Sequence, residues 1–417
     1  MKPKLSLSFQ QEKNIYFVND ECEETLVIVC IKAGCGQEPS GKNGIAHLVE
    51  HICLSYRKYI PSSCNSSLIF NEIRSSGFTN YGQTILMFSF PSHMDNINMF
   101  HQILMIILSN AIITNKTFEI SKLELLAECK QKGSQWYWQQ ELISFITNSQ
   151  INELPVGKVD EIVQLQMKDA VTFIQNNYTN DNLALIYFTG LQVPEIISNL
   201  NQTIPCVDTV TPNSLNHHEL GISYGVEQQK FNLSICRLEH PTNLKVVDFY
   251  YQQTYQSVNL KEKLTRMLFE IITKISIDEY VSVSPYANRC SDVSVKDKHV
   301  SAYFYYAVFT LTFISIDDTI STFAEDIAYY LKRLLITEEK LKASKESISP
   351  FLCEPEQPSR VELFQNISSH FFYGEPIHIT CEHYNQLKEL LDKIEVSDLM
   401  SYKNWILNAP CKIVIST

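Results

Sequence analysis

The segment His47-Leu48-Val49-Glu50-His51 places two imidazoles and one carboxylate within five residues. Residues four apart share a face of a helix, so His47 and His51 can bind one metal ion together. Glu50 follows His47 by three residues and lies on nearly the same face. Its carboxylate can therefore reach a water molecule on the metal without being a ligand itself. This spacing predicts a metal site with a general base beside it.

The residues before this segment predict the elements that position it. Residues 24–31 form a β-branched, apolar run that is typical of a buried strand. Glycine, proline and polar residues between positions 33 and 44 then predict a turn. Asn43 is the expected N-cap of a helix that starts near Ile45 and carries the motif. A strand, a turn and a helix in this order would hold the ligands rigidly.

A catalytic zinc ion usually takes three protein ligands, so a third ligand is expected elsewhere in the chain. Residues 118–132 have the apolar periodicity of an amphipathic helix and carry Glu119, Glu124 and Glu128. Glutamates on such a helix usually form its solvated face. Periodicity alone does not choose among the three.

The motif and its distance from Glu128 resemble the pitrilysin family of zinc peptidases, which includes insulin-degrading enzyme and the mitochondrial processing peptidase. His-x-x-Glu-His is the inverted zincin signature. Seventy-six residues separate His51 from Glu128, as in the family's spacing to its glutamate ligand. The resemblance implies one Zn²⁺ per chain, held by His47, His51 and Glu128, with Glu50 as the catalytic base. Cys53, two residues beyond His51, is then not needed as a ligand.

The resemblance extends over most of the chain and implies an α+β fold. It implies two homologous domains, each a mixed β-sheet flanked by helices, as in the mitochondrial processing peptidase. Residues 163–185 and 394–415 support this, because each contains a helix with an Asp near its start and then a short strand. We predict a metal-binding catalytic domain over residues 1–195, a linker over 196–224, and a homologous domain without metal over 225–417. A chain of 417 residues has room for two such cores.

The family has a further glutamate seven residues before its ligand glutamate, and that position is Ser121 here. Glu124 lies one helical turn before Glu128, on the same face. Glu124 is therefore a candidate for the supporting role, with a plain surface residue as the alternative.

Substrate binding is where the sequence departs most from the family. The resemblance implies an edge strand that pairs with an extended peptide, and residues 84–91 are similar to this strand. Asn80 and Thr84 are the candidate substrate-binding residues. The family's second domain also offers an Arg and a Tyr with six residues between them. Residues 225–417 contain no such pair, because Glu279 stands where the Arg would precede Tyr286.

The missing Arg-Tyr pair implies that a homologous, metal-free subunit supplies this substrate grip in a heterodimer, with a homodimer as the alternative. The expected function is zinc-dependent cleavage of peptides, or of the leader of a precursor peptide, with this chain as the catalytic subunit. The alternative is a non-catalytic homologue that binds peptides or serves as a scaffold.

Composition narrows the partners and the location. A formal net charge of −12 disfavours nucleic acid as a partner. The 12 cysteines contain no Cys-x-x-Cys pair, which predicts reduced core residues rather than a disulfide framework. We expect no signal peptide and no membrane span, since the apolar run at residues 100–113 is too short and reads as a core helix. The expected location is cytoplasmic.

Overall fold

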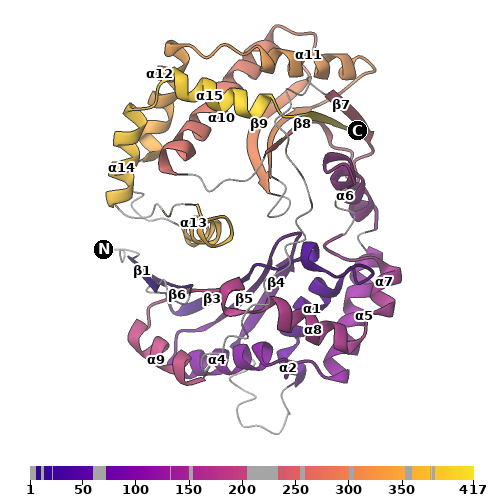
Figure 1. The fold of residues 1–417 in the computed structure, drawn as a ribbon, viewed down its shortest axis with the longest axis vertical. Helices are drawn as coiled ribbons and strands as arrows, with labels where there is room; N and C mark the ends of the chain where they lie inside the picture. Colours follow the sequence, from indigo (N-terminus) through magenta and orange to yellow (C-terminus); the bar gives the residue numbers. More distant parts are fainter. Residues whose placement is uncertain are drawn as a thin grey trace. The chain divides into compact units, whose positions relative to one another are not determined.

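The computed structural model describes residues 6–10, 14–20, 22–59, 72–131, 133–149, 154–203, 233–253, 259–299, 305–352, 359–375, 377 and 381–417. These residues form two compact units (Figure 1). Unit 1 contains the described residues within 1–132, 153–226 and 357–372. Unit 2 contains those within 133–152, 227–356 and 373–417.

Unit 1 is built on a six-stranded mixed sheet. Across the sheet its strands are β1 (Ser6–Gln10), β2 (Ile15–Asn19), β6 (Leu183–Thr189), β3 (Glu24–Ile31), β5 (Thr84–Pro91) and β4 (Arg74–Thr79). Only β2 and β6 are parallel neighbours, and the other pairs are antiparallel. Every residue of β6 is buried, which accounts for its continuous apolar run.

Helices cover this sheet. They are α1 (Ile45–Leu54), α2 (Tyr56–Tyr59), α4 (Met94–Leu108), α5 (Asn115–Gln131), α7 (Val159–Gln164), α8 (Met167–Asn177) and α9 (Val193–Thr203), with 3₁₀ turns η2 (Cys35–Gln37) and η3 (Asn180–Asn182). Figure 1 shows α1, α4, α8 and α9 along one side of the strands. Helix α4 buries Phe100, Ile103, Leu104 and Ile107, the helical spacing expected of a core helix.

Unit 2 repeats the topology of unit 1. Its strands, in order across the sheet, are β7 (Leu233–Leu238), β11 (Cys411–Ser416), β8 (Lys245–Gln253), β10 (Tyr305–Phe313) and β9 (Cys290–His299). The last strand, β11, lies between β7 and β8, parallel to β7 and antiparallel to β8, as β6 lies between β2 and β3 in unit 1. The order matches β2-β6-β3-β5-β4, so the predicted α+β fold with two homologous domains is confirmed.

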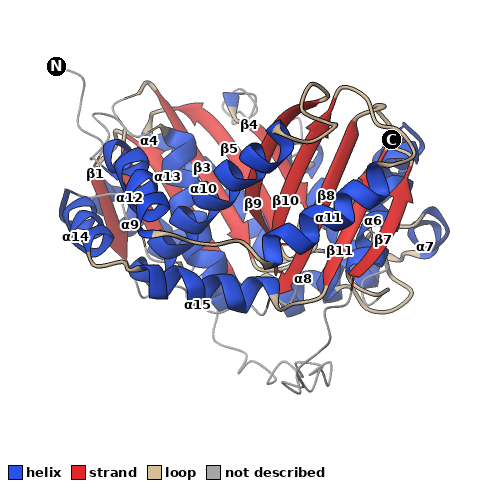
Figure 2. Ribbon diagram, turned by 90° about the horizontal axis from the view of Figure 1, so that it is seen from above, coloured by secondary structure: helices blue, strands red, loops and turns tan. Residues whose placement is uncertain are grey.

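The helices of unit 2 follow the same plan. They are α10 (Leu260–Ser282), α11 (Ile320–Lys332), α12 (Glu338–Ile348), α14 (Cys381–Asp392) and α15 (Val396–Leu407), with the 3₁₀ turn η4 (Ser349–Leu352). Figure 2 shows α10 and α11 lying across the strands of this sheet. In each unit the second of the matching strands in chain order leads into a helix, α1 after β3 and α10 after β8, and an antiparallel strand pair follows, so α10 is the topological counterpart of α1.

One ion pair recurs at matching places in the two units. Lys42 Nζ donates to Asp169 at 2.9 Å, and Lys261 Nζ donates to Asp398 at 2.8 Å. Each aspartate is the third residue of its helix, α8 or α15, and accepts a backbone N–H from the residue before that helix. The repeated Asp near a helix start, noted in the sequence, therefore ties that helix to the beginning of the motif helix or its counterpart.

Two helices pack in the unit formed mainly by the other half of the chain. Helix α13 (Arg360–Tyr373) belongs to unit 1, where Arg360 pairs with Asp20 and donates to the Glu24 carbonyl at 3.1 Å. Helix α6 (Gly133–Ile146) belongs to unit 2, where the Tyr306 hydroxyl donates to the Ile146 carbonyl at 3.0 Å. The predicted boundaries, 1–195 and 225–417, follow chain order. They therefore assign α6 to the first domain and α13 to the second, whereas each helix packs in the other unit.

The predicted linker, residues 196–224, is described only in part. Its first residues complete α9, which packs on α4 in unit 1. The remainder, from residue 204, lies outside the described residues. Among the described helices, none combines the length and the apolar composition needed to cross a bilayer.

A buried histidine joins three elements of unit 1. His101 on α4 has no exposed surface, and its ring nitrogens lie 2.6 Å from Asn199 Oδ1 and 3.0 Å from the Tyr187 hydroxyl. The amide oxygen can only accept, so Nδ1 carries the proton and Nε2 accepts from Tyr187. Burial lowers the pKa of His101 from 6.5 to about 4.

We predict that His101 makes unit 1 less stable in mild acid. Between pH 6.5 and 4 the unfolded chain binds a proton that the native His101 does not, so stability is full above pH 6.5 and falls below it. The loss between pH 7.5 and 5 is about 2 kcal/mol. Urea unfolding of metal-stripped protein at both pH values should show a smaller difference for His101→Gln than for wild type. An identical difference would contradict the assignment.

Candidate metal centre

Helix α1 begins at a position that only glycine can occupy. Gly44 is the N-cap residue with a φ of 101°, and a Cβ there would lie 2.7 Å from Ile162 Cγ1. The expected N-cap, Asn43, instead donates its side-chain amide to Glu38 at 2.6 Å. Glu38 accepts the backbone N–H groups of Gly44 and Ala46 at 3.0 and 2.9 Å. A carboxylate from an earlier turn therefore caps the helix, which favours its positive end.

The motif side chains meet Glu128 from α5. Glu128 Oε2 lies 3.7 Å from His47 Nε2 and 3.5 Å from His51 Nε2. One potential ligand atom from each of these three residues lies within 4.8 Å of the others. Two residues from one helical turn and one residue 77 positions later thus converge on one point.

The donor set fits a divalent metal ion. In a tetrahedral site with metal–ligand distances of about 2.0–2.1 Å, neighbouring ligand atoms are about 3.4 Å apart. The two nitrogen–oxygen distances to Glu128 match this separation closely. Two imidazoles and one carboxylate also leave a fourth position for water. His47, His51 and Glu128 can therefore hold one ion.

Glu50 lies beside this group in a nearly water-free position. It is 4% exposed, and its Oε2 lies 3.9 Å from His47 Nε2. Burial raises the pKa of Glu50 to about 7, with the nearby Glu128 charge adding to the rise and a hydrogen bond from Thr79 opposing it. A metal ion held by the neighbouring ligands would favour the charged carboxylate.

Two residues of β4 hold the Glu50 carboxylate, and no sequence pattern indicated either of them. Thr79 Oγ1 donates to Glu50 Oε2 at 2.7 Å. At Gly77, a Cβ would lie 3.0 Å from Glu50 Oε1 and 2.8 Å from the Ile85 carbonyl, so glycine leaves room for the carboxylate. A Gly and a Thr in one short strand are unremarkable in sequence, and only the pairing of β4 with β5 brings them to the motif.

Glu124 lies next to the same histidine pair. Its Oε2 is 3.8 Å from His51 Nδ1, on the side of the ring away from the Nε2 that faces Glu128. Acceptors in this position commonly orient metal-bound imidazoles. Ser121 is fully buried, and its hydroxyl lies 3.3 Å from that of Ser55. The position that departs from the family thus packs on the motif helix.

The residues expected to bind substrate do not lie on an open edge. Thr84 has no exposed surface, and its hydroxyl donates to the Ala33 carbonyl at 2.8 Å. Asn80 Oδ1 accepts the N–H groups of Gly82 and Gln83, both at 3.0 Å, and so closes the β4–β5 turn. Strand β5 lies between β3 and β4, so the prediction that residues 84–91 form the edge strand is wrong. The edge is β4, whose polar, glycine-containing sequence gave little strand signal.

Other candidates from the sequence have structural partners instead. Cys53 is fully buried, and burial raises the pKa of its thiol. In unit 2, Glu279 pairs with Lys340 at 3.0 Å, and the Tyr286 hydroxyl donates to Asp317 at 2.6 Å.

Comparison with known proteins agrees with this arrangement. Residues 16–159 match the model of the insulinase family, peptidase family M16. A probable zinc protease, PqqL, from Haemophilus influenzae is 20% identical over 277 residues, which cover 62% of this chain and 29% of that protein. Residues 16–159 therefore match an M16 domain, of the insulinase or pitrilysin family, and this similarity supports a peptidase function.

Solved structures share the fold of the whole chain. The periplasmic protease PqqL from Escherichia coli superposes with a TM-score of 0.77 at 15% identity, covering 99% of this chain and 47% of that one. An M16 peptidase inactive domain from Pseudomonas fluorescens superposes with a TM-score of 0.69 at 12% identity, covering 99% and 98%. The chain thus spans less than half of both PqqL proteins.

We predict that chelator-stripped protein binds one equivalent of Zn²⁺ or Co²⁺. His51→Ala and Glu128→Ala should abolish tight binding, because each removes one of three ligands. Glu50→Gln should retain it, and Glu124→Gln should weaken it by about tenfold or more if Glu124 orients His51. Competition with a chromophoric chelator measures the affinities of wild type and of all four variants. Wild-type affinity in His51→Ala would place the ion elsewhere.

Proposed function

We propose that this chain is a zinc-dependent endopeptidase that cleaves peptides or the leader of a precursor peptide. The convergence of His47, His51 and Glu128, with Glu50 buried beside them, carries this proposal. Metal-assisted hydrolysis requires a set of metal ligands and an adjacent general base, and both are present here. Similarity to the M16 family supports the same reaction class.

Glu50 would act as the proton carrier. When bound, zinc supplies the Lewis acidity that activates water and polarises a peptide carbonyl. Glu50 accepts the proton of the attacking water and delivers it to the leaving amine. Thr79 donates to Oε2, the carboxylate oxygen that lies toward His47, and Gly77 leaves room for Oε1, so these two residues fix the carboxylate beside the metal ligands. His51 is held between Glu128 and Glu124, which limits rotation of its ring.

Strand β4 is the proposed docking edge for the substrate. It is the last strand of its sheet, and its residues are exposed or half-buried in alternation. An extended peptide that adds to this edge would run past Gly77 and Thr79, the residues in contact with Glu50. Backbone pairing of this kind is largely independent of side chains, which suits the processing of varied peptides.

We further propose that the active form is a heterodimer in which a homologous, metal-free subunit supplies the Arg-Tyr grip. The support is the absence of an Arg and a Tyr with six residues between them in residues 225–417. The second candidate function is that of a non-catalytic homologue that binds peptides. It is supported by the M16 peptidase inactive domain from Pseudomonas fluorescens, which has the same fold. A cytoplasmic location stays a prediction.

Peptide-library cleavage tests the reaction and the assembly together. Wild type and Glu50→Gln are each incubated alone and with a homologous family member from the same organism. We expect cleavage only in the wild-type mixture, with Glu50→Gln at least about a hundredfold slower because the proton carrier is lost.

The two proposals fail in different ways. Full activity of purified wild type alone would contradict the heterodimer and leave the peptidase intact. No cleavage in any mixture, with one zinc bound per chain, would contradict the peptidase and favour the non-catalytic homologue.

Thr79 provides a graded test of the Glu50 geometry. Thr79→Val should lower kcat by about tenfold or more, because it removes a hydrogen bond to a charged carboxylate. Thr79→Ser keeps the donor and should restore most of the rate. Zinc affinity should stay unchanged in both variants, since Thr79 does not contact the ligand set. Equal kcat values for the valine and serine variants would contradict the role.

A further inference from the structure

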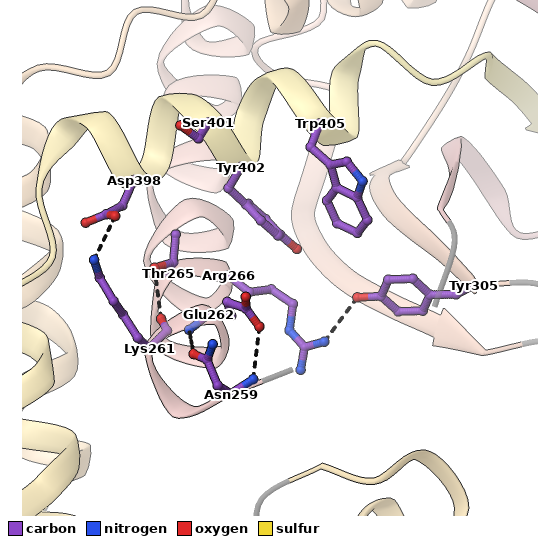
Figure 3. A pocket seen from close by; sticks show the side chains of 10 residues that line it. All are labelled: Asn259, Lys261, Glu262, Thr265, Arg266, Tyr305, Asp398, Ser401, Tyr402 and Trp405. Carbon is purple, nitrogen blue, oxygen red and sulfur yellow. Dashed lines mark hydrogen bonds and ion pairs between the residues drawn. The ribbon is translucent and has the colours of Figure 1, made fainter. Parts of the chain in front are cut away.

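Unit 2 has a pocket beside the helix that corresponds to the motif helix of unit 1. Its volume is about 460 Å³. Its walls come from the first turns of α10, from α15 and from Tyr305 at the start of β10 (Figure 3). Helix α10 carries no metal-binding motif. The pocket lies beside its first turns, and the first turns of the counterpart helix α1 carry the metal ligands His47 and His51.

A buried guanidinium forms one side of the pocket. The Arg266 side chain is 12% exposed, and its Nε lies 2.9 Å from Asp297 Oδ2. Its Nη1 donates to the Tyr305 hydroxyl at 3.1 Å, as Figure 3 shows, and its Nη2 lies 3.5 Å from Glu375. These contacts engage each of the three guanidinium nitrogens once, and both η nitrogens carry a second N–H group.

The cations around the pocket are already compensated, and Glu262, which also lines it, accepts the Asn259 backbone N–H at the N-terminus of α10. Two carboxylates, Asp297 and Glu375, balance two cations. These are the guanidinium of Arg266 and the ammonium of Lys263, which lies 3.1 Å from Glu375. On the opposite wall, Lys261 pairs with Asp398. An anionic ligand would therefore lose hydration without gaining an unpaired cation, whereas a neutral carbonyl oxygen can accept from Arg266 at little electrostatic cost.

Aromatic rings form the rest of the wall. Tyr402 and Trp405 have ring centroids 5.7 Å apart, and Tyr402 also packs edge-on against Phe269 at 5.4 Å. Trp405 is 41% exposed, although tryptophan is usually well buried. A braced tyrosine and an accessible indole offer faces on which a further ring can stack.

We propose that this pocket binds an uncharged aromatic side chain of a peptide, whose backbone carbonyl accepts from Arg266. The proposal builds on the proposed peptidase function and adds a second peptide-binding position, in unit 2. Its chemistry is stacking on Tyr402 and Trp405 together with one hydrogen bond, and it involves no metal ion. It therefore predicts a preference for peptides with Phe, Tyr or Trp.

Binding without turnover tests this proposal in the full-length Glu50→Gln protein. The probes are acetyl-Ala-Phe-Ala-amide and the same peptide with Ala, Lys or Glu at the centre. We expect the Phe peptide to bind at about millimolar concentration or below, and at least tenfold more tightly than the others, by calorimetry. Metal-loaded and metal-stripped protein should bind it equally. Fluorescence of Trp405, one of three tryptophans, should change on binding, and Trp405→Phe should lack this change.

Filling the pocket provides the decisive control. Ser401 on α15 lines the pocket and is exposed, so Ser401→Trp blocks it without removing a buried contact. This variant should bind the Phe peptide at least tenfold more weakly. Ser347→Trp, an exposed position on α12 away from the lining, should bind like its parent.

The remaining outcomes would overturn the proposal. Equal affinity in Ser401→Trp and its parent would place binding elsewhere, and loss of binding on metal removal would place it at the metal site. Tighter binding of the Lys or Glu peptide would overturn the ligand class. No saturable binding of any probe would overturn the pocket as a peptide site. Failure of the peptidase proposal is separate, because it is measured by wild-type cleavage.

Discussion

The close approach of two carboxylates to one imidazole pair is the constraint on which the rest of the structure depends. Glu50 and Glu128 both lie within 4 Å of His47 Nε2, and Glu50 is almost inaccessible to water. Like charges in such a place repel and are poorly hydrated, so the arrangement needs a cation to be favourable. The surrounding elements enforce it nonetheless. Glycine at position 77 makes room for Glu50, and Thr79 fixes one of its oxygens.

The same scaffold is used twice with different chemistry. Both sheets have one strand order, and the Lys42–Asp169 pair of unit 1 recurs as Lys261–Asp398 in unit 2. Around the counterpart helix α10, the metal ligands are replaced by an arginine whose charge is balanced within the protein. The two units thus share their packing, but the side chains on the first turns of α1 and α10 differ. Function depends on such site residues rather than on the fold that carries them.

The sequence predicted the strands and helices best where the pattern is local. The buried strand before the motif, the helix carrying Glu128 and the final strand of each unit lie where the periodicity places them. Predictions about edges and caps were weaker. Residues 84–91 were predicted as the edge strand from the family resemblance, and a local sequence pattern reports which residues are buried but not how many neighbours a strand has. Asn43 has the chemistry of an N-cap, but Glu38 competes for the same N–H groups from an earlier turn.

By itself, the sequence determined the ligand types, their spacing along the chain and the helical face that His47, Glu50 and His51 share, because these follow from covalent order and helix geometry. The family's spacing then singled out Glu128 among three glutamates. Only the tertiary structure decided that β4 is the edge beside Glu50 and that Thr79 holds its carboxylate. It also decided that Arg266 and Tyr305, 39 residues apart, meet in a pocket. Contacts of this kind depend on how strands pair and helices pack, which local patterns do not encode.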